Sequence, residues 1–221
     1  MNRNDQILMT EKFVRENMKG YDSGHDWWHI ERVRNLALFI NKMEELADPF
    51  IVEITALLHD TADSKFAAVS NEQGYTAIDG FLDECELSEI KEQVLTVIKN
   101  VSFSSVDKTG NPYDHLLWVI QDADRLDAIG AIGIARAFNY GGFRNNKIFN
   151  PEVMNFDEVS AENQLSGTAS TISHFYEKLL LLKYRMNTLT AKKLATERHE
   201  FLEIFLKQFY NEWNFALGKN L

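Results

Sequence analysis

The sequence has little of several features that mark common protein classes. Cys85 is the single cysteine among 221 residues, so no intramolecular disulfide can form and cysteine-rich zinc sites are excluded. Only 3 prolines and 11 glycines occur. Because proline and glycine mark turns, their scarcity favours long helices over many short strands.

Basic side chains are scarce relative to acidic ones. Lys and Arg together number 23 against 33 Asp and Glu, which gives a formal net charge of −10. Proteins bind the backbone of nucleic acids through Lys and Arg that displace counterions, so most of this surface would repel DNA and RNA. A polybasic attachment to anionic lipid is disfavoured for the same reason. We therefore expect no nucleic-acid polymer and no membrane among the partners.

Long hydrophobic runs are also lacking. No uncharged apolar stretch approaches the roughly 18 residues that a membrane-spanning helix needs. The segment from Met1 to Thr10 includes Asp5 and lacks the apolar core of a secretory signal. These absences predict a cytoplasmic protein.

What is present is a helical pattern. Hydrophobic residues make up 45% of the chain and charged residues 25%, as in ordinary globular proteins. Apolar residues recur with the helical period in many segments, and no segment alternates as a strand would. We therefore predict an all-α protein. The segments with helical periodicity are 26–46, the stretch after Pro49, 87–100, 115–138, 174–186 and 201–213.

One polar stretch interrupts this pattern. Residues 139–168 contain paired glycines and paired asparagines and show no sustained period. A loop of this length is uncommon in a compact domain, so the stretch is either a functional lid or a set of short helices. No linker divides the chain, and we predict a single domain over residues 1–221.

The pair His59-Asp60 ends an otherwise apolar helical run. A neutral imidazole beside a carboxylate at the end of a buried helix is costly unless both groups find partners. Adjacent helical residues point about 100° apart, so both side chains can reach one cation beside the helix. A terminal histidine next to a solvated aspartate explains the same residues, and the pair alone does not decide between the two interpretations.

Two further segments carry groups of the same chemistry. His25 and His29 lie four residues apart, and hence on one helical face. Asp122, Asp124 and Asp127 fall in a strongly apolar helical pattern, where they either form a solvated face or share a cation that offsets their repulsion. On a helix Asp124 and Asp127 lie about 60° apart and share a face, whereas Asp122 points away.

Read in chain order, His29, His59-Asp60 and Asp124 resemble the pattern His, His-Asp, Asp of the HD-domain superfamily of metal-dependent phosphohydrolases. The neighbouring residues match too. His-Ile-Glu-Arg-Val from His29 resembles the first motif, His-Asp-Thr-Ala-Asp-Ser-Lys from His59 the second, and Ala-Asp-Arg-Leu around Asp124 the last. Further on, His-Phe-Tyr-Glu-Lys-Leu-Leu at 174–180 is similar to the C-terminal segment of small single-domain bacterial members.

The resemblance implies an HD-type helical core over about residues 20–136 and a C-terminal helical extension over about 137–221. It also implies one divalent metal ion per chain. Two imidazoles and two carboxylates suit Mn²⁺ or Mg²⁺ and can also hold Fe²⁺, Co²⁺, Ni²⁺ or Zn²⁺. Such an ion polarises a phosphoryl oxygen and lowers the pKa of the water that attacks phosphorus. The implied metal ligands are His29, His59, Asp60 and Asp124.

Other residues near these motifs receive candidate roles. Asp63 is either the base that takes the proton of the attacking water or a carboxylate at a helix end. Lys65 either neutralises a phosphate oxygen or is an exposed lysine, and His25 either binds phosphate or caps its own helix. Arg32 is expected to pair with an internal carboxylate, and Asp127 to orient a metal ligand from the second layer around the ion.

A phosphate-binding pocket needs cations from outside the motifs. His174 and Lys178 would share a helical face, because they are four residues apart. Each candidate is by itself also an ordinary solvated side chain. The candidates are Arg136, Arg144, His174, Lys178 and Lys183.

Three functions compete. The leading function is hydrolysis of a small phosphorylated compound with release of phosphate or pyrophosphate. A nucleotide is the favoured substrate. HD proteins with two metals, which are oxygenases or phosphodiesterases, carry further histidines before the last aspartate, whereas only His115 lies between Asp60 and Asp124 here. A nucleotide-sensing module would be expected to have lost a metal ligand, and all four are present. The sequence is compatible with a homo-oligomer.

Overall fold

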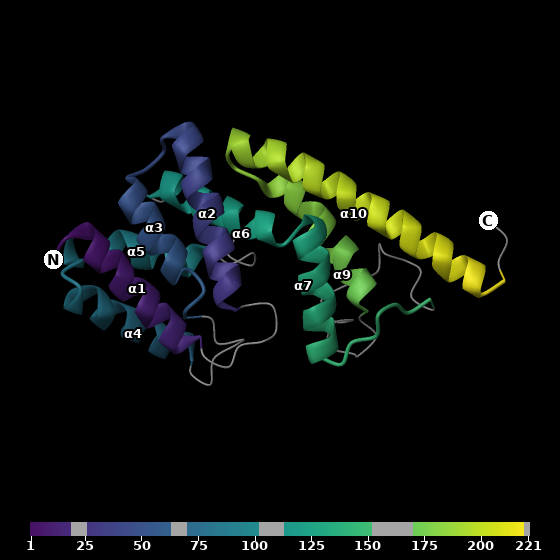
Figure 1. The fold of residues 1–221 in the computed structure, drawn as a ribbon, viewed down its shortest axis with the longest axis horizontal. Helices are drawn as coiled ribbons and strands as arrows, with labels where there is room; N and C mark the ends of the chain where they lie inside the picture. Colours follow the sequence, from purple (N-terminus) through teal and green to yellow (C-terminus); the bar gives the residue numbers. More distant parts are fainter. Residues whose placement is uncertain (19–25, 63–69, 102–112, 152–169, 219–221) are drawn as a thin grey trace. The chain divides into compact units, whose positions relative to one another are not determined.

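The computed structural model describes residues 1–18, 26–62, 70–101, 113–151 and 170–218 (Figure 1). Every regular element in these ranges is helical, and their β pairing is limited to the isolated bridge between Lys147 and Ser170. The prediction of an all-α protein is confirmed. Among the described helices, none combines the length and the apolar character needed to cross a membrane.

The chain divides by its internal contacts into two compact units, Met1–Asp124 and Arg125–Leu221. The helices that begin in the first unit are α1 (Arg3–Asn17), α2 (Trp27–Glu44), α3 (Pro49–Leu58), α4 (Asn71–Glu84), α5 (Ser88–Asn100) and α6 (Asp114–Asp127). Those of the second unit are α7 (Gly130–Phe143), α9 (Thr171–Glu177), the 3₁₀ helix η2 (Leu179–Arg185) and α10 (Leu189–Ala216). The single domain and its limits at residues 20–136 and 137–221 stay a prediction.

Local sequence explains the start of α3. The carboxylate of Asp48 accepts a hydrogen bond from the backbone N–H of Phe50 at 2.8 Å. Pro49 is the first helical residue, where its missing N–H costs nothing. The helix that was expected after Pro49 is confirmed, as are those near 26–46 and 87–100.

The expectation of one continuous helix over 115–138 is wrong. Helix α6 ends at Asp127 and α7 begins at Gly130, which has a φ of +75°. An L side chain rarely adopts this left-handed conformation, so the break depends on glycine. The apolar period continues across the break because both helices bury one face, and periodicity alone therefore could not reveal it.

The expected helix over 174–186 is only partly present. Helix α9 ends at Glu177, and the chain continues from Leu179 to Arg185 as the 3₁₀ helix η2. Helices α1 and α4 were not predicted. The sequence does contain a signal for α4, because Ser70 and Gln73 form a capping box at its N-terminus.

The core of the first unit surrounds α3. All side chains from Ile54 to Leu58 are buried, and Phe13 stacks on Phe81 with 4.1 Å between ring centroids. Arg34 on α2 ties three helices together, since its Nη1 donates to Glu11 at 2.8 Å and its Nε donates to Glu53 at 2.9 Å. This packing holds the C-terminal end of α3, where His59 follows, in a fixed place beside α2.

The core of the second unit is aromatic. Phe175 on α9 is fully buried and stacks on Phe205 of α10 with 5.6 Å between ring centroids. Phe138 of α7 packs against both rings, at 6.1 and 5.9 Å. Three helices are thereby joined through one cluster, and the helical segment predicted at 201–213 is confirmed as part of α10.

Replacement by alanine is expected to have opposite effects on the free energy of unfolding at two glycines of α4. A Cβ at Gly74 would lie 2.7 Å from the backbone Cα of Ala62, whereas a Cβ at Gly80 would meet nothing within 4 Å. Gly80→Ala is expected to raise the free energy of unfolding by about 0.5–1 kcal/mol through helix propensity. Gly74→Ala is expected to lower it by about 1–3 kcal/mol, because α4 must shift. Urea unfolding of both variants tests this pair, and equal effects would contradict it.

Candidate metal centre

Three helices bring ligand atoms together in the first unit. One ligand atom each of His29 (on α2), His59 (directly after α3) and Asp124 (on α6) lies within 4.8 Å of the other two. Asp60 joins them, because its Oδ2 lies 3.8 Å from Nε2 of His29, while Oδ1 of Asp124 lies 3.6 Å from the same nitrogen. Three of the four side chains that the family pattern singled out therefore form one cluster, and the fourth, Asp60, contacts this cluster through His29.

The distances at this cluster suit an ion better than direct hydrogen bonds. Nitrogen and oxygen atoms joined by a hydrogen bond are about 2.7–3.2 Å apart, and both distances to His29 are longer. Ligand atoms that each lie about 2.1 Å from one ion are separated by roughly 3–3.5 Å. Nε2 of His29 lies 3.6 and 3.8 Å from the two carboxylate oxygens, and these distances are close to the separation expected for ligands of one ion.

His59 is oriented as a ligand by its own helix. Its Nδ1 lies 2.8 Å from the carbonyl oxygen of Ala56, and a carbonyl only accepts, so Nδ1 carries the proton. In the neutral ring the lone pair is then on Nε2. This atom is buried and has no hydrogen-bond partner within the described residues. A buried acceptor left in this state is costly unless something binds it, as a metal ion would.

His29 is held by the start of its helix. Asp26 is the N-cap of α2, and its Oδ1 accepts from the backbone N–H of His29 at 2.9 Å. The side chain of His29 is fully buried, whereas that of Asp124 is 35% exposed. The cluster is therefore buried at the histidine and partly exposed to solvent at Asp124.

The donor set fits a divalent cation. Two imidazoles and the carboxylate of Asp124 meet in one place, Asp60 lies beside His29, and His59 contributes a buried Nε2 that has no hydrogen-bond partner among the described residues. Carboxylate oxygens and imidazole nitrogens are shared preferences of Mn²⁺, Fe²⁺ and the other first-row ions. These residues could therefore hold a metal, and they differ from an exposed acidic cluster by their burial.

Three of the residues that the sequence singled out lie outside the described part of the chain. They are His25, Asp63 and Lys65. Their roles in phosphate binding and proton transfer stay predictions. The same holds for the lid, since most of residues 139–168 also fall outside the described ranges.

Asp127 and Arg32 were expected close to the ligands. Asp127 is buried one helical turn after Asp124, and its Oδ2 accepts from Nη1 of Arg136 at 2.7 Å. Arg136, a candidate phosphate-binding residue, is thus engaged by a carboxylate. Arg32 is half-buried on α2. The orienting roles of Asp127 and Arg32 stay predictions.

The remaining candidates lie in the second unit. Arg144 follows α7 and is exposed. His174 lies on α9, and Lys178 caps it, with its backbone N–H donating to the carbonyl of His174 at 3.1 Å. The shared helical face of His174 and Lys178 stays a prediction, since Lys178 is the non-helical residue at the end of α9, and so does their contact with a substrate.

His174 predicts a pH dependence of stability. Burial, assisted by the charge of Lys178, lowers the pKa of His174 from 6.5 to about 4. Below pH 6.5 the unfolded chain takes up a proton that the folded chain takes up only near pH 4, so acid weakens folding in this window. The contribution of neutral His174 to the free energy of unfolding is fully present above pH 6.5, and it amounts to at most about 3 kcal/mol.

NMR titration of the His174 ring is expected to place its midpoint near pH 4, and a midpoint near 6.5 would contradict the burial effect. His174→Gln, which cannot be protonated in this range, should flatten the dependence of the unfolding free energy on pH between these two values.

Two groups that support the site were not found from the sequence. Asp26 caps α2 and positions His29, and the carbonyl of Ala56 sets the tautomer of His59. The first could have been found, because an aspartate directly before a periodic helix is a common N-cap. A backbone carbonyl leaves no signal in the sequence.

Comparison with known proteins matches a family domain to the part of the chain that carries the cluster. A family model described as the HD domain matches residues 27–129, a range that contains His29, His59, Asp60 and Asp124. The chain is also similar to the protein YpgQ of Bacillus subtilis, with 37% identity over 204 residues that cover 92% of this chain and 91% of YpgQ.

Solved structures show the same fold. A protein of Lactobacillus plantarum has a TM-score of 0.81 at 32% identity, covering 95% of this chain and 97% of its own. A HD-superfamily hydrolase from Bacillus thuringiensis has a TM-score of 0.74 at 37% identity, covering 96% and 99%. YpgQ in complex with ADP has a TM-score of 0.73 at 34% identity, covering 93% and 97%.

Proposed function

Because this chain belongs to the HD-domain family, we propose that it is a metal-dependent phosphohydrolase that acts on a small phosphorylated compound, preferably a nucleotide. The observation that carries the proposal is the convergence of His29, His59 and Asp124, whose ligand atoms lie within 4.8 Å of one another. Asp60 is proposed as the fourth ligand, on the ground of its contact with His29.

A divalent ion held by these residues would supply Lewis-acid polarisation of a phosphoryl oxygen and would acidify a water molecule. His59 presents Nε2 because its Nδ1–H donates to Ala56, so the ring needs no rearrangement to bind. Asp60 and Asp124 balance the charge of the ion. The partial exposure of Asp124 leaves one side of the cluster accessible to a phosphate group.

Residues beyond the ligands are proposed to complete the reaction. Asp63, three residues after Asp60, would accept the proton of the attacking water. Lys65 and His25 would face the negative charge of the substrate phosphates. Asp63 and Lys65 lie in the stretch that resembles the family's second motif, and His25 lies four residues before His29.

His174, Lys178 and Arg144 are proposed to bind the phosphate groups of the substrate. His174, with a pKa of about 4, is neutral at pH 7 and would donate a hydrogen bond to a phosphate oxygen without adding charge. Lys178 and Arg144 would supply the positive charge. These two residues supply few positive charges, and this favours a substrate with few phosphates over a polyanion.

The preference for a nucleotide rests on a relative. YpgQ, 34% identical to this chain, has been solved in complex with ADP. A nucleotide also agrees with the strongly acidic net charge of −10, because a local cation admits a small anion while the surface repels a long one. The one cysteine, Cys85, is buried and forms no disulfide. This suits the reducing cytoplasm, which we propose as the location of the protein.

The proposal is tested by incubating the full chain with Mn²⁺ and a panel of nucleoside mono-, di- and triphosphates, with separate assays for phosphate and pyrophosphate. We expect one of the two products from at least one nucleotide, and its loss when EDTA removes the metal. Tight binding of a nucleotide without product in any divalent metal would contradict hydrolysis and would support a sensing module instead.

A further inference from the structure

The longest helix of the chain has two apolar faces. Helix α10, drawn in yellow-green and yellow in Figure 1, spans 28 residues from Leu189 to Ala216. One face is buried in the second unit through Ala195, Leu202 and Leu206. A single buried face is sufficient to fix a surface helix, so a second apolar face needs another explanation.

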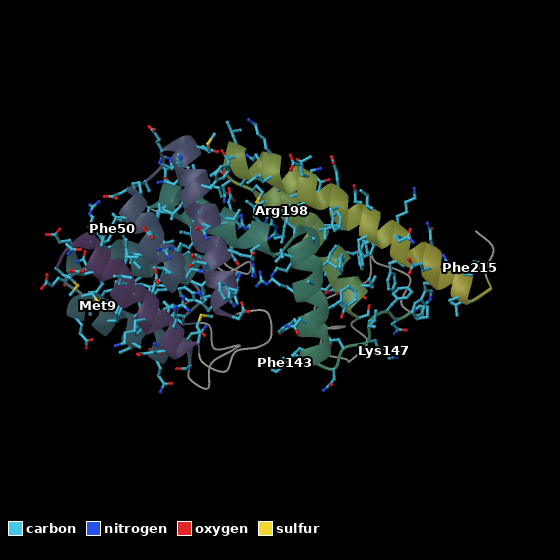
Figure 2. All side chains as sticks on the ribbon, in the orientation of Figure 1. Met9, Phe50, Phe143, Lys147, Arg198 and Phe215 are labelled. Atoms are coloured by element: carbon cyan, nitrogen blue, oxygen red, sulfur yellow. The ribbon has the colours of Figure 1, made fainter. Side chains whose placement is uncertain are left out.

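The second face is an exposed stripe. Phe201 is 47% exposed, Ile204 64% and Phe215 79%, the last labelled near the C-terminal end of the helix in Figure 2. These three residues fall within about 60° of arc, and the stripe lies about 150° around the helix from the buried face. Large apolar side chains gathered on one exposed face mark a surface for association.

The spacing of the stripe is that of a helix pair. Its positions follow one another at alternating intervals of four and three residues, the interval pattern of a coiled-coil seam. Phe201 and Ile204, which flank the midpoint of α10, are apolar, whereas Glu197 and Gln208 on either side of them are polar, and this pattern fixes the register of a pair. The stripe consists of Glu197, Phe201, Ile204, Gln208, Asn211 and Phe215.

We propose that this stripe pairs with the same stripe of a second copy, with the two α10 helices antiparallel around a two-fold axis. In such a pair Phe201 packs against Ile204 of the second copy, and the reverse contact forms at the same time. The same register lays Leu189 opposite Ala216 of the second copy, so the helices overlap along their full length of about 42 Å.

Charge selects a second copy as the partner. Lys193, Glu200 and Lys207 lie along one edge of the stripe at intervals of seven residues, and all three are exposed. In an antiparallel pair the same edge of each helix faces its counterpart, so Glu200 of one copy meets Lys207 of the other, twice by symmetry. This edge of the stripe is therefore complementary to itself in charge.

The proposal does not depend on the proposed function and is tested by the mass of the full chain in solution. Sedimentation over a dilution series is expected to show a species of twice the 25.5 kDa of one chain. Ile204→Glu should raise the dissociation constant of the pair at least about thirtyfold, as the loss of a central anchor does. Leu8→Glu is the matched control, since Leu8 on α1 is 62% exposed and lies off the stripe, and it should leave the constant unchanged.

A charge exchange tests the orientation. Glu200→Lys alone places like charges opposite each other and should weaken the pair on the order of tenfold at low salt. Glu200→Lys combined with Lys207→Glu restores opposite charges and should return the wild-type constant. A monomer at every concentration, a pair that survives Ile204→Glu, or a double exchange that is weaker than the single one would overturn the proposal.

Discussion

Asp124→Asn is expected to abolish metal-dependent phosphate or pyrophosphate release while leaving the helices intact. The substitution keeps the shape of the side chain and removes the charge that faces His29 at 3.6 Å. Replacing a residue that only orients a metal ligand costs about 10- to 100-fold, so loss of a direct ligand is expected to cost at least about 10³-fold. The affinity for Mn²⁺, measured by titration calorimetry, should fall together with the activity.

The matched control for this variant is Asp114→Asn. Asp114 lies in the first turn of the same helix, ten residues before Asp124. Its loss removes a favourable charge at the helix N-terminus, worth about 0.3–1 kcal/mol, and should leave metal binding unchanged. Equal metal affinity in wild type and Asp124→Asn would exclude Asp124 as a ligand.

Arg136→Met is expected to lower the free energy of unfolding by about 1–3 kcal/mol, because it removes one of two guanidinium groups that stabilise the buried carboxylate of Asp127, the other being that of Arg198. Asp127 is 2% exposed, and its carboxylate accepts from Arg136 at 2.7 Å. Urea unfolding measures the effect. The double variant with Asp127→Asn removes both charges, and should be less destabilised than Arg136→Met alone.

Arg144→Met is the matched control for stability. Arg144 directly follows α7, the helix that carries Arg136, and it is exposed. Its replacement should therefore change the unfolding free energy by less than about 0.5 kcal/mol. An effect below 1 kcal/mol for Arg136→Met would contradict the account of the buried pair. A fall in metal affinity of about 10- to 100-fold in folded Arg136→Met would support the orienting role proposed for Asp127.

The cluster was predictable from the sequence because its chemistry is local to three short motifs. His59-Asp60 closes a helix whose last residues are all buried, and this burial is legible as an unbroken apolar run. Asp124 was preferred over Asp127 by the family pattern, and the structure engages Asp127 with Arg136 instead. No periodicity argument could have shown that ion pair, because it joins two helices.

The breaks between helices were not predictable in the same way. The end of α6 depends on the positive φ of Gly130, and a single glycine in an apolar pattern is compatible with a continuous helix. Likewise, the tautomer of His59 depends on a backbone carbonyl that leaves no trace in the amino-acid pattern. Backbone conformation, rather than side-chain chemistry, is what the sequence left open.

A crystal structure of the full chain with Mn²⁺, with the metal located by anomalous scattering, would test the single-metal centre most directly. We predict one peak per chain, about 2.0–2.4 Å from Nε2 of His29 and of His59 and from a carboxylate oxygen of Asp60 and of Asp124. Absence of a peak among these atoms, or two peaks about 3.5–4 Å apart, would contradict a single-metal centre built from these residues.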